Sequence, residues 1–580
     1  MMKLREILCA VVLMWAPAAR AQTTPSAADQ RLQALYQSDW AWSMREFAQI
    51  DDGEGGVTDD DHLPSVTPAA QARRTAHWQE ALATLNAIPA DQLSEGERVN
   101  AAVLRTNLDI AIADARFREW EMPFNSDSSF WSYLAERQQL RDAAAYRRYL
   151  GRMRDMPRYF REQIANMRTG LARGFSVPRV TLEGRDQSIA SFTEANIERN
   201  PFYAPFATMP TTIPAAEQEA LRREARAAIQ SAVIPAYQNL LRFYRNDYLS
   251  RARTSIGASA LPNGAEYYAA QIREYTTLDM SAEEVHQLGL REVARIEAEM
   301  QNVMREAGFA GTLAEFIAFL RTDPQFYART PDELMMTSAW VAKRTDERIG
   351  DVIGLLPRRR FGIVPVPDAI APFYTAGRGG LRSCMMNTYN LPSRPLYNIP
   401  ALTLHECAPG HSMQAALAEE REAMPAFRRY TYFSGYGEGW GLYSEYLGIE
   451  LGIYRTPYEN FGRLSYEMWR AARLVIDTGI HQYGWSRAQA IDYLASHTAL
   501  SQHEVETEID RYISWPGQAL AYKLGEITIR GLRGEAEAAL GERFDLRPFH
   551  DEILALGSVP LSALQEHMRR YIATRQAEPH

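Results

Sequence analysis

Cysteine is scarce in this sequence, which has 3 cysteines in 580 residues. A disulfide framework is therefore excluded as the main source of stability. No apolar run approaches the roughly 20 residues needed to cross a bilayer. The net charge of −9 disfavours nucleic acids and anionic membranes as partners. A composition of 46% hydrophobic and 23% charged residues is typical of a globular protein with a large core.

Two common catalytic signatures are missing as well. No glycine-rich loop ends in the Gly-Lys-Ser/Thr sequence of a P-loop, which disfavours phosphate binding of that type. No Gly-x-Ser-x-Gly elbow occurs, which weighs against a serine hydrolase. Internal repeats are also absent, so a single domain is the economical expectation.

The first residues have the features of an export signal. Two basic residues precede an apolar run over residues 7–16, and a small-x-small cleavage site ends at Ala21. We therefore expect a signal peptide over residues 1–21 and a mature domain over residues 22–580. The mature protein would be periplasmic or secreted, without an integral membrane segment. The leucine before Cys9 argues against lipid attachment, because that signal normally has a small residue there.

Helical periodicity dominates the mature chain. Apolar residues recur at helical spacing over long stretches such as 142–173 and 213–249, although Pro157 and Pro235 fall inside them. Short β-prone runs broken by glycine and proline gather between residues 361 and 389. The expected fold is mainly α, with a large helical domain in one or two lobes and a small β-sheet or extended strands placed late in the chain.

The chemistry concentrates in His405-Glu406-Cys407-Ala408-Pro409-Gly410-His411. Two imidazoles and a carboxylate are the parts of a zinc hydrolase, but the usual motif has its histidines four residues apart on one helix face. Here they are six apart, which turns the second by roughly 240° on a straight helix. Because Pro409-Gly410 can disturb a helix, we predict a bend or bulge there. His405 and His411 would then bind zinc, and Glu406 would activate the zinc-bound water as general base.

A third protein ligand is needed, because a catalytic zinc site keeps one of its four positions for water. Glu438 is the best candidate, since it follows His411 by 27 residues, enough for an antiparallel helix to return. Glu445 lies seven residues further, about two turns along the same helix face. It would either orient a ligand histidine from outside the ligand set or be a surface residue.

Residues downstream supply candidates for the rest of a peptidase site. Hydrogen-bond donors to an oxyanion are expected from Tyr522 and His481, and Asp477 could fix the tautomer of the histidine four residues after it. A cation for a substrate carboxylate is expected from Lys523 or Arg473. Each of these side chains also fits a structural role on its helix.

The two cysteines of the mature chain, Cys384 and Cys407, precede the motif and lie within it. In an oxidising compartment such residues can form a disulfide. Since the sequence does not give their separation, both the bridged and the free state stay open.

Several of these stretches together resemble a large bacterial family, domain of unknown function 885. The resemblance covers most of the mature chain. One departure from the family pattern is Ser412, where relatives often carry another histidine. The family is distantly similar to helical zinc peptidases such as thimet oligopeptidase, angiotensin-converting enzyme and carboxypeptidase Taq. That similarity implies a deep active-site channel and zinc held by His405, His411 and Glu438. The residues that carry the family resemblance are the His-Glu-x-x-Pro-Gly-His motif, Leu261-Pro262-Asn263-Gly264, Glu438-Gly439-Trp440, Asp477-x-Gly479-x-His481 and Pro516-Gly517-Gln518-Ala519.

The sequence therefore predicts an exported zinc metallopeptidase that hydrolyses short peptides, as an oligopeptidase or a carboxypeptidase. Two alternatives stay open. A hydrolase of non-peptide amides or esters would use the same Lewis-acid chemistry. A non-catalytic exported binding protein would keep the helical fold, although it has no need for a base such as Glu406.

Overall fold

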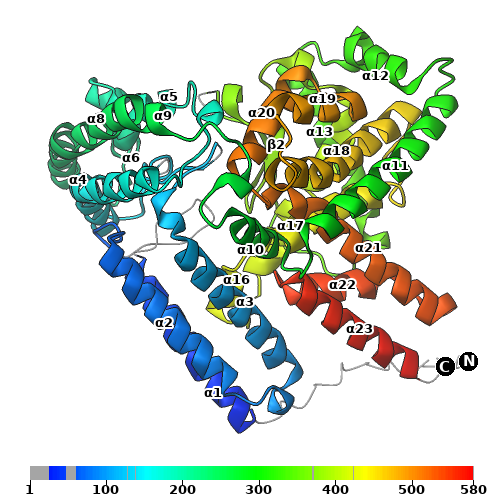
Figure 1. Cartoon of the computed structure of the whole chain (residues 1–580), viewed down its shortest axis with the longest axis horizontal. Coiled ribbons are helices and arrows are strands. Elements are labelled where there is room, and N and C mark those ends of the chain that lie inside the picture. The colour runs from blue at the N-terminus through cyan, green and yellow to red at the C-terminus, as the bar shows by residue number, and fades with distance from the viewer. Residues whose placement is uncertain are drawn as a thin grey trace, which may run out of the picture.

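The computed structural model describes residues 25–47, 60–126, 128–136, 139–368, 371–421 and 423–578, so the expected signal peptide lies outside it. Within these residues most elements are helices, which confirms the mainly α prediction (Figure 1). None of the described helices has the length and apolarity needed to cross a membrane. The division of residues 22–580 into lobes stays a prediction.

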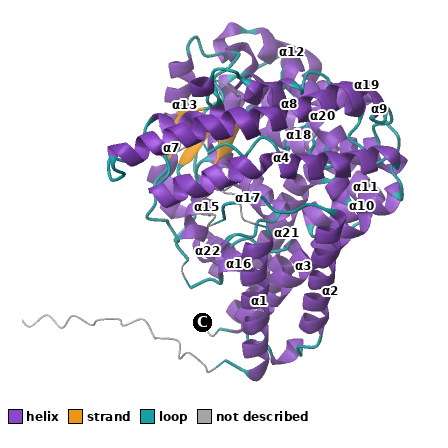
Figure 2. Cartoon of the chain, turned by 90° about the vertical axis from the view of Figure 1, so that its left-hand side faces the viewer, coloured by secondary structure: helices purple, strands orange, loops and turns teal. Residues whose placement is uncertain are grey.

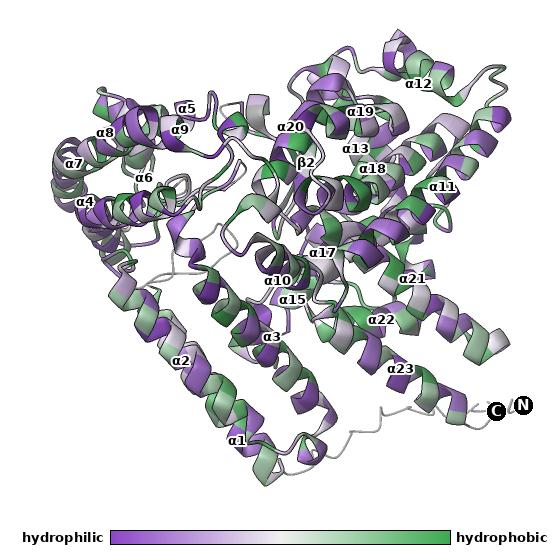
Figure 3. Ribbon diagram, in the orientation of Figure 1, coloured by the Kyte–Doolittle hydropathy of each residue, from purple (hydrophilic) through white to green (hydrophobic). Residues whose placement is uncertain are grey.

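The first helices form an extended arm at the lower left of Figure 1. Helix α1 begins at a capping box, in which Ser26 and Asp29 accept each other's backbone amides. Leu32 of α1, Leu85 of α2 and Leu104 of α3 are buried in one apolar cluster. Hydrophilic and hydrophobic residues are interspersed along α2 (Figure 3). The helices of the arm are α1 (Ala27–Glu46), α2 (Pro68–Asn86) and α3 (Glu95–Phe117).

A second group of helices has an apolar cluster of its own, at the upper left of Figure 1. Helix α4 continues through Pro157, so the sequence stretch around this proline is one helix. Around Pro235 the chain also stays helical, because the proline occupies the first turn of α8 after a π-helical turn at Ile229–Val233. The group comprises α4 (Ala143–Ala172), α5 (Gln187–Ala190), α6 (Ala204–Ala207), α7 (Ala215–Ala228), α8 (Ile234–Phe243) and α9 (Leu249–Arg251).

The remaining helices include α18, in which every residue from Phe461 to His481 is buried. Helix α11 packs closely on it at Gly289, where a Cβ would lie 2.7 Å from the Leu474 Cβ. These helices are α10 (Gly264–Thr276), α11 (Ala282–Glu306), α12 (Leu313–Thr322), α13 (Pro331–Arg348), α14 (Ile399–Glu406), α15 (His411–Glu419), α16 (Ala426–Arg429), α17 (Ser434–Leu447), α18 (Pro457–His481), α19 (Arg487–His497), α20 (Gln502–Ser514), α21 (Ala521–Leu540), α22 (Leu546–Leu556) and α23 (Leu561–Ala577).

A small sheet precedes the His-Glu motif, as the sequence predicts (Figure 2). Its strands are β1 (Gly362–Pro365), β2 (Gly377–Gly379) and β3 (Ser383–Met386), in the order β1-β3-β2. Strand β3 is parallel to β1 and antiparallel to β2. Strand β2 is an edge of the sheet and contacts α14, so the sheet supports the helix that carries the first motif residues.

Candidate metal centre

The His-Glu motif is divided between two helices. Helix α14 ends at Glu406, because the backbone of Cys407 leaves the helical region, and α15 begins at His411. The turn between them is closed by a hydrogen bond from Gly410 N–H to Leu404 O at 3.0 Å. A glycine is required there, since a Cβ at this position would lie 1.8 Å from the backbone oxygen of His405. The predicted bend is confirmed, as a complete break in the helix.

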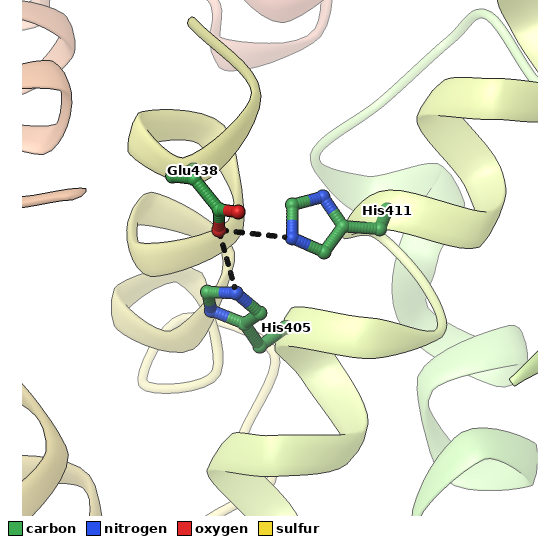
Figure 4. Close-up of side chains that lie close together, drawn as sticks. All are labelled: His405, His411 and Glu438. Carbon is green, nitrogen blue, oxygen red and sulfur yellow. Dashed lines mark hydrogen bonds and ion pairs between the residues drawn. The ribbon is translucent and has the colours of Figure 1, made fainter. Parts of the chain in front are cut away.

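The break brings His405 and His411 together with Glu438 of α17 (Figure 4). The Glu438 Oε2 atom lies 3.4 Å from His405 Nε2 and 3.2 Å from His411 Nε2. Donor atoms placed about 2.0–2.1 Å from a tetrahedral zinc are separated by about 3.3 Å. The three side chains therefore fit a zinc ion in both chemical type and spacing.

The electrostatics of this group favour a cation among its members. Burial alone would lower the pKa of His405, but hydrogen bonds with Glu438 and Glu445 outweigh it and raise the pKa to about 9. Burial would raise the pKa of Glu438, but the charge of His411 and hydrogen bonds from both histidines hold it well below its usual value. In this arrangement the histidines gain positive charge by binding protons. A metal ion bound among them can supply the same positive charge.

Glu445 supports the first imidazole from behind. Its Oε1 accepts a hydrogen bond from His405 Nδ1 at 2.8 Å, and the carboxylate is 1% exposed. This contact places the proton of neutral His405 on Nδ1 and leaves Nε2 with a free lone pair facing Glu438. Of the two roles that the sequence leaves open for Glu445, the surface residue is excluded by its burial, and its contact orients His405.

Glycines in α17 make room for the site. A Cβ at Gly441 would lie 2.7 Å from His405 Cε1, so the imidazole packs directly on the helix backbone. A Cβ at Gly439 would lie 2.5 Å from the Cα of Gly525, which allows α17 and α21 to approach closely. The glycine at every second position of residues 435–441 is a signal for this packing that helical periodicity alone does not reveal.

Glu406 is held at the edge of the sheet. Its Oε2 accepts a hydrogen bond from Gly379 N–H of β2 at 2.5 Å. Ser412 connects the same parts, because its hydroxyl donates to Glu406 O at 3.0 Å and accepts from Gly380 N–H at 3.2 Å. A serine at this position thus fastens the motif to the loop after β2.

Cys384 of β3 and Cys407 form a disulfide with an S–S distance of 2.01 Å. Both cysteines are fully buried. Of the two states that the sequence leaves open, the structure contains the bridge, which ties the sheet covalently to the residue after Glu406.

Comparison with known proteins places the chain in a family. Residues 51–568 match a family described as "Bacterial protein of unknown function (DUF885)". This chain belongs to the DUF885 family. A search of curated proteins found no match. The resemblance to zinc peptidases stays a prediction.

Two solved structures resemble this DUF885 protein. The crystal structure of "the putative lipoprotein from Colwellia psychrerythraea" matches with 26% identity and a TM-score of 0.85, covering 95% of this chain and 100% of its own. The structure of "a putative lipoprotein of unknown function from Shewanella oneidensis" matches with 18% identity and a TM-score of 0.66. That match covers 94% of this chain and 100% of the other, and it shows the fold alone.

The structure does not support the role expected for His481. Its Nδ1 accepts from Ala258 N–H and its Nε2 donates to Tyr512 O, each at 2.9 Å, so neither nitrogen can serve an oxyanion. Burial lowers the pKa of His481 to about 3. Asp477 does not contact this histidine but accepts from the Tyr268 hydroxyl at 2.6 Å. Both predictions are wrong because α18 is buried on all sides, where polar groups pair with neighbouring backbone and side chains.

The two cations expected to bind a substrate carboxylate are both buried. Lys523 is completely buried, and its partners are Glu292, Glu467 and Glu526. Arg473 is 1% exposed and donates to Glu508 at 2.9 Å and to the Tyr512 hydroxyl at 2.7 Å. Since the charge of Lys523 is already paired inside the protein, the prediction of substrate binding is wrong for it. For Arg473 it stays a prediction, because Nη1 has no hydrogen-bond partner among the described residues and the guanidinium lies 4.3 Å from the centroid of the Tyr522 ring.

Two tyrosines lie near the ligands, one expected and one missed. The ring centroid of Tyr522 is 6.3 Å from that of His405, and Arg511 Nη2 donates to its hydroxyl at 3.3 Å. Tyr432 precedes α17, and the hydroxyl end of its side chain lies on Gly437, next to Glu438. Desolvation of the hydroxyl end, together with the charge of Glu438, raises the pKa of Tyr432 well above its usual value. No sequence pattern marks Tyr432, because the loop that carries it has no periodicity.

A second carboxylate group also escapes sequence reasoning. Asp114, Glu119 and Glu274 have ligand atoms within 4.8 Å of one another. Burial, and for Glu119 also the charge of Asp114, raises the pKa of Asp114 to about 7 and of Glu119 to about 8. The neighbouring Tyr275 packs against the apolar group that contains Tyr522. These carboxyls come from α3, the turn after it and α10, so only the tertiary fold brings them together.

Proposed function

We propose that this DUF885 protein is a zinc metallopeptidase that hydrolyses short peptides. The observation that carries the proposal is the arrangement of a three-ligand set beside a carboxylate base. His405, His411 and Glu438 converge, and Glu406 adjoins the first ligand while the sheet edge holds its side chain. A structural zinc site has four protein ligands, whereas three leave a position for water. The set found among the described residues has three.

The roles of the chain's own residues follow from their contacts. A bound zinc would act as a Lewis acid toward water and the scissile carbonyl. Glu406 takes a proton from the attacking water on Oε1, because Gly379 N–H engages Oε2. The same carboxyl then returns this proton to the leaving amine. Tyr522 donates a hydrogen bond to the carbonyl oxygen as negative charge develops on it.

Two features support an exported enzyme. Residues 1–21 have the features of a signal peptide. The Colwellia psychrerythraea protein, which is similar over its full length, carries a lipoprotein description. Peptides as the substrate class rest on the resemblance of the motif and its third ligand to helical zinc peptidases.

The test is hydrolysis of a defined library of short peptides by the zinc-loaded protein, read by mass spectrometry. Glu406→Gln should lower the rate by about 10²-fold or more while zinc content is retained. Glu419→Gln is the matched control, because Glu419 pairs with Arg359 at the far end of α15. Full activity of Glu406→Gln would contradict the proposal. If the protein hydrolysed esters or non-peptide amides but no peptides, its substrates would belong to that class instead of peptides.

The ligand set is tested separately by metal analysis. His411→Ala should lose zinc, because His411 supplies one of the three donors. If its zinc content equalled that of the wild type, the break between α14 and α15 would have no role in metal binding.

A further inference from the structure

The loop between α16 and α17 fixes the backbone on both sides of Tyr432. Before it, Thr431 Oγ1 accepts from Asn107 Nδ2 at 3.1 Å and donates to Phe427 O at 2.8 Å. After it, Phe433 is buried and its N–H donates to Ser558 Oγ at 2.8 Å. The side chain of Tyr432 is 56% exposed. Rotation of the side chain, rather than movement of the loop, therefore determines where its hydroxyl lies.

The hydroxyl end of Tyr432 rests on the first turn of α17. A Cβ at Gly437 would lie 2.3 Å from the phenolic oxygen, so the absence of a side chain at 437 makes room for the phenol. From there the hydroxyl lies beside Glu438, the residue that follows Gly437 and the third member of the candidate ligand set. The hydroxyl end of Tyr432 thus lies next to the candidate metal centre, although the residue as a whole is more than half exposed.

We propose that Tyr432 is a catalytic residue of this centre, whose hydroxyl donates a hydrogen bond to the substrate carbonyl oxygen together with Tyr522. This inference rests on the proposed function. If Glu438 held a metal ion, its carboxylate would have less negative charge to offer a phenol, and the Tyr432 hydroxyl would be available for an oxygen of the substrate. Tyr432 would be the second hydrogen-bond donor to the oxyanion. His481 cannot take this role, because both of its ring nitrogens are already engaged. Rotation of an exposed ring lets the donor follow the oxygen as the carbonyl becomes tetrahedral.

The experiment compares Tyr432→Phe with Tyr430→Phe in the full chain. Tyr430 is 55% exposed on the same loop and stacks on Trp40 at 5.5 Å, so its variant controls for loss of a phenol near the site. Three quantities are measured: zinc affinity by chelator competition, kcat and KM for a cleaved peptide, and the Kd of a phosphinic peptide. The phosphinate mimics the tetrahedral oxyanion, and its binding needs no turnover.

For Tyr432→Phe we expect zinc affinity and KM close to wild type, a kcat lower by about 10²–10³-fold, and a similar loss of phosphinate affinity. Gly437→Ala should show the same pattern, because the new methyl group displaces the phenol while leaving its hydroxyl intact. Tyr430→Phe should behave as wild type.

Unchanged kcat and phosphinate affinity in Tyr432→Phe would overturn the proposal. Weaker zinc binding would overturn it as well, because Tyr432 would then only orient Glu438. If the wild type cleaves no peptide, phosphinate binding separates the two proposals. If the wild type binds the phosphinate and Tyr432→Phe does not, the donor role is supported although the peptidase proposal fails. If the wild type does not bind the phosphinate either, the donor role is refuted too.

Discussion

Replacement of Glu445 by glutamine tests whether the first imidazole is held for metal binding. Glu445 is 1% exposed, and its Oε1 accepts from His405 Nδ1 at 2.8 Å. Glutamine preserves the shape of the side chain but removes the negative charge. The amide oxygen can still accept from Nδ1, but the imidazole loses the negative charge that makes Nε2 a better donor to a metal.

The expected magnitude follows from this single contact. Changes to the outer partner of a metal-binding histidine weaken metal affinity by about 10–100-fold. That range corresponds to about 1.4–2.7 kcal/mol. A hydrogen bond to a charged group, worth about 1.5–3 kcal/mol, gives a similar value. Arg470 also lies 3.5 Å from Glu445 Oε1, but it keeps its packing over Trp469 at 4.2 Å. Any loss of folding stability should therefore be smaller than the loss of zinc affinity.

The assay is competition for zinc between the protein and a chromogenic chelator at neutral pH, with thermal unfolding measured in parallel. Glu450→Gln is the matched control, since Glu450 follows α17 and pairs with Arg533 rather than with a ligand. Glu445→Gln should bind zinc about 10–100-fold more weakly than this control. Equal affinities for zinc in the two variants would refute the role assigned to Glu445.

Three further predictions concern the surroundings of the centre. Gly441→Ala should weaken zinc binding by about tenfold or more in the same competition assay, because the new methyl group collides with the first imidazole. Replacing Cys384 and Cys407 together by serine opens a bridge that spans 23 positions, so the free energy of unfolding measured in urea should fall by about 3 kcal/mol. Burial raises the pKa of Asp114 and Glu119 above unfolded values of about 4, so their contribution to stability is complete below pH 4 and is lost as pH rises toward 8. Urea midpoints should fall over this range, and less so in Glu119→Gln; a midpoint independent of pH would contradict the assigned shifts.

The part of the centre that depends on local spacing could be predicted from the sequence. The break at Pro409-Gly410 follows from the mismatch between six residues and a helical turn. Glu438 and Glu445 lie on one face of α17 because they are seven residues apart, and both reach His405. The short β-prone runs broken by glycine and proline predict the small sheet before the motif.

The errors share a physical cause. Around His481 and Lys523 the helices are buried on every side, and polar residues there satisfy one another within the core. A sequence pattern shows which residues share a helix face but not whether that face meets solvent, a cavity or another helix. Sequence patterns do not reveal Tyr432 or the carboxyl of Glu119 either. They lie outside regular helices, and their partners are remote in the sequence or depend on how the chain folds.

The six-residue spacing changes what holds the second imidazole. When histidines are four residues apart, a single helix orients both of them. Here α14 orients only His405, and the direction of His411 depends on the turn that separates the helices. That turn is fixed from outside, because Trp440 Nε1 donates to Pro409 O at 2.8 Å and a Cβ at Gly379 would lie 2.6 Å from the His411 Cβ. The helix that supplies Glu438 thus also positions the turn, so correct packing of α17 brings the carboxylate and the second histidine to the centre together.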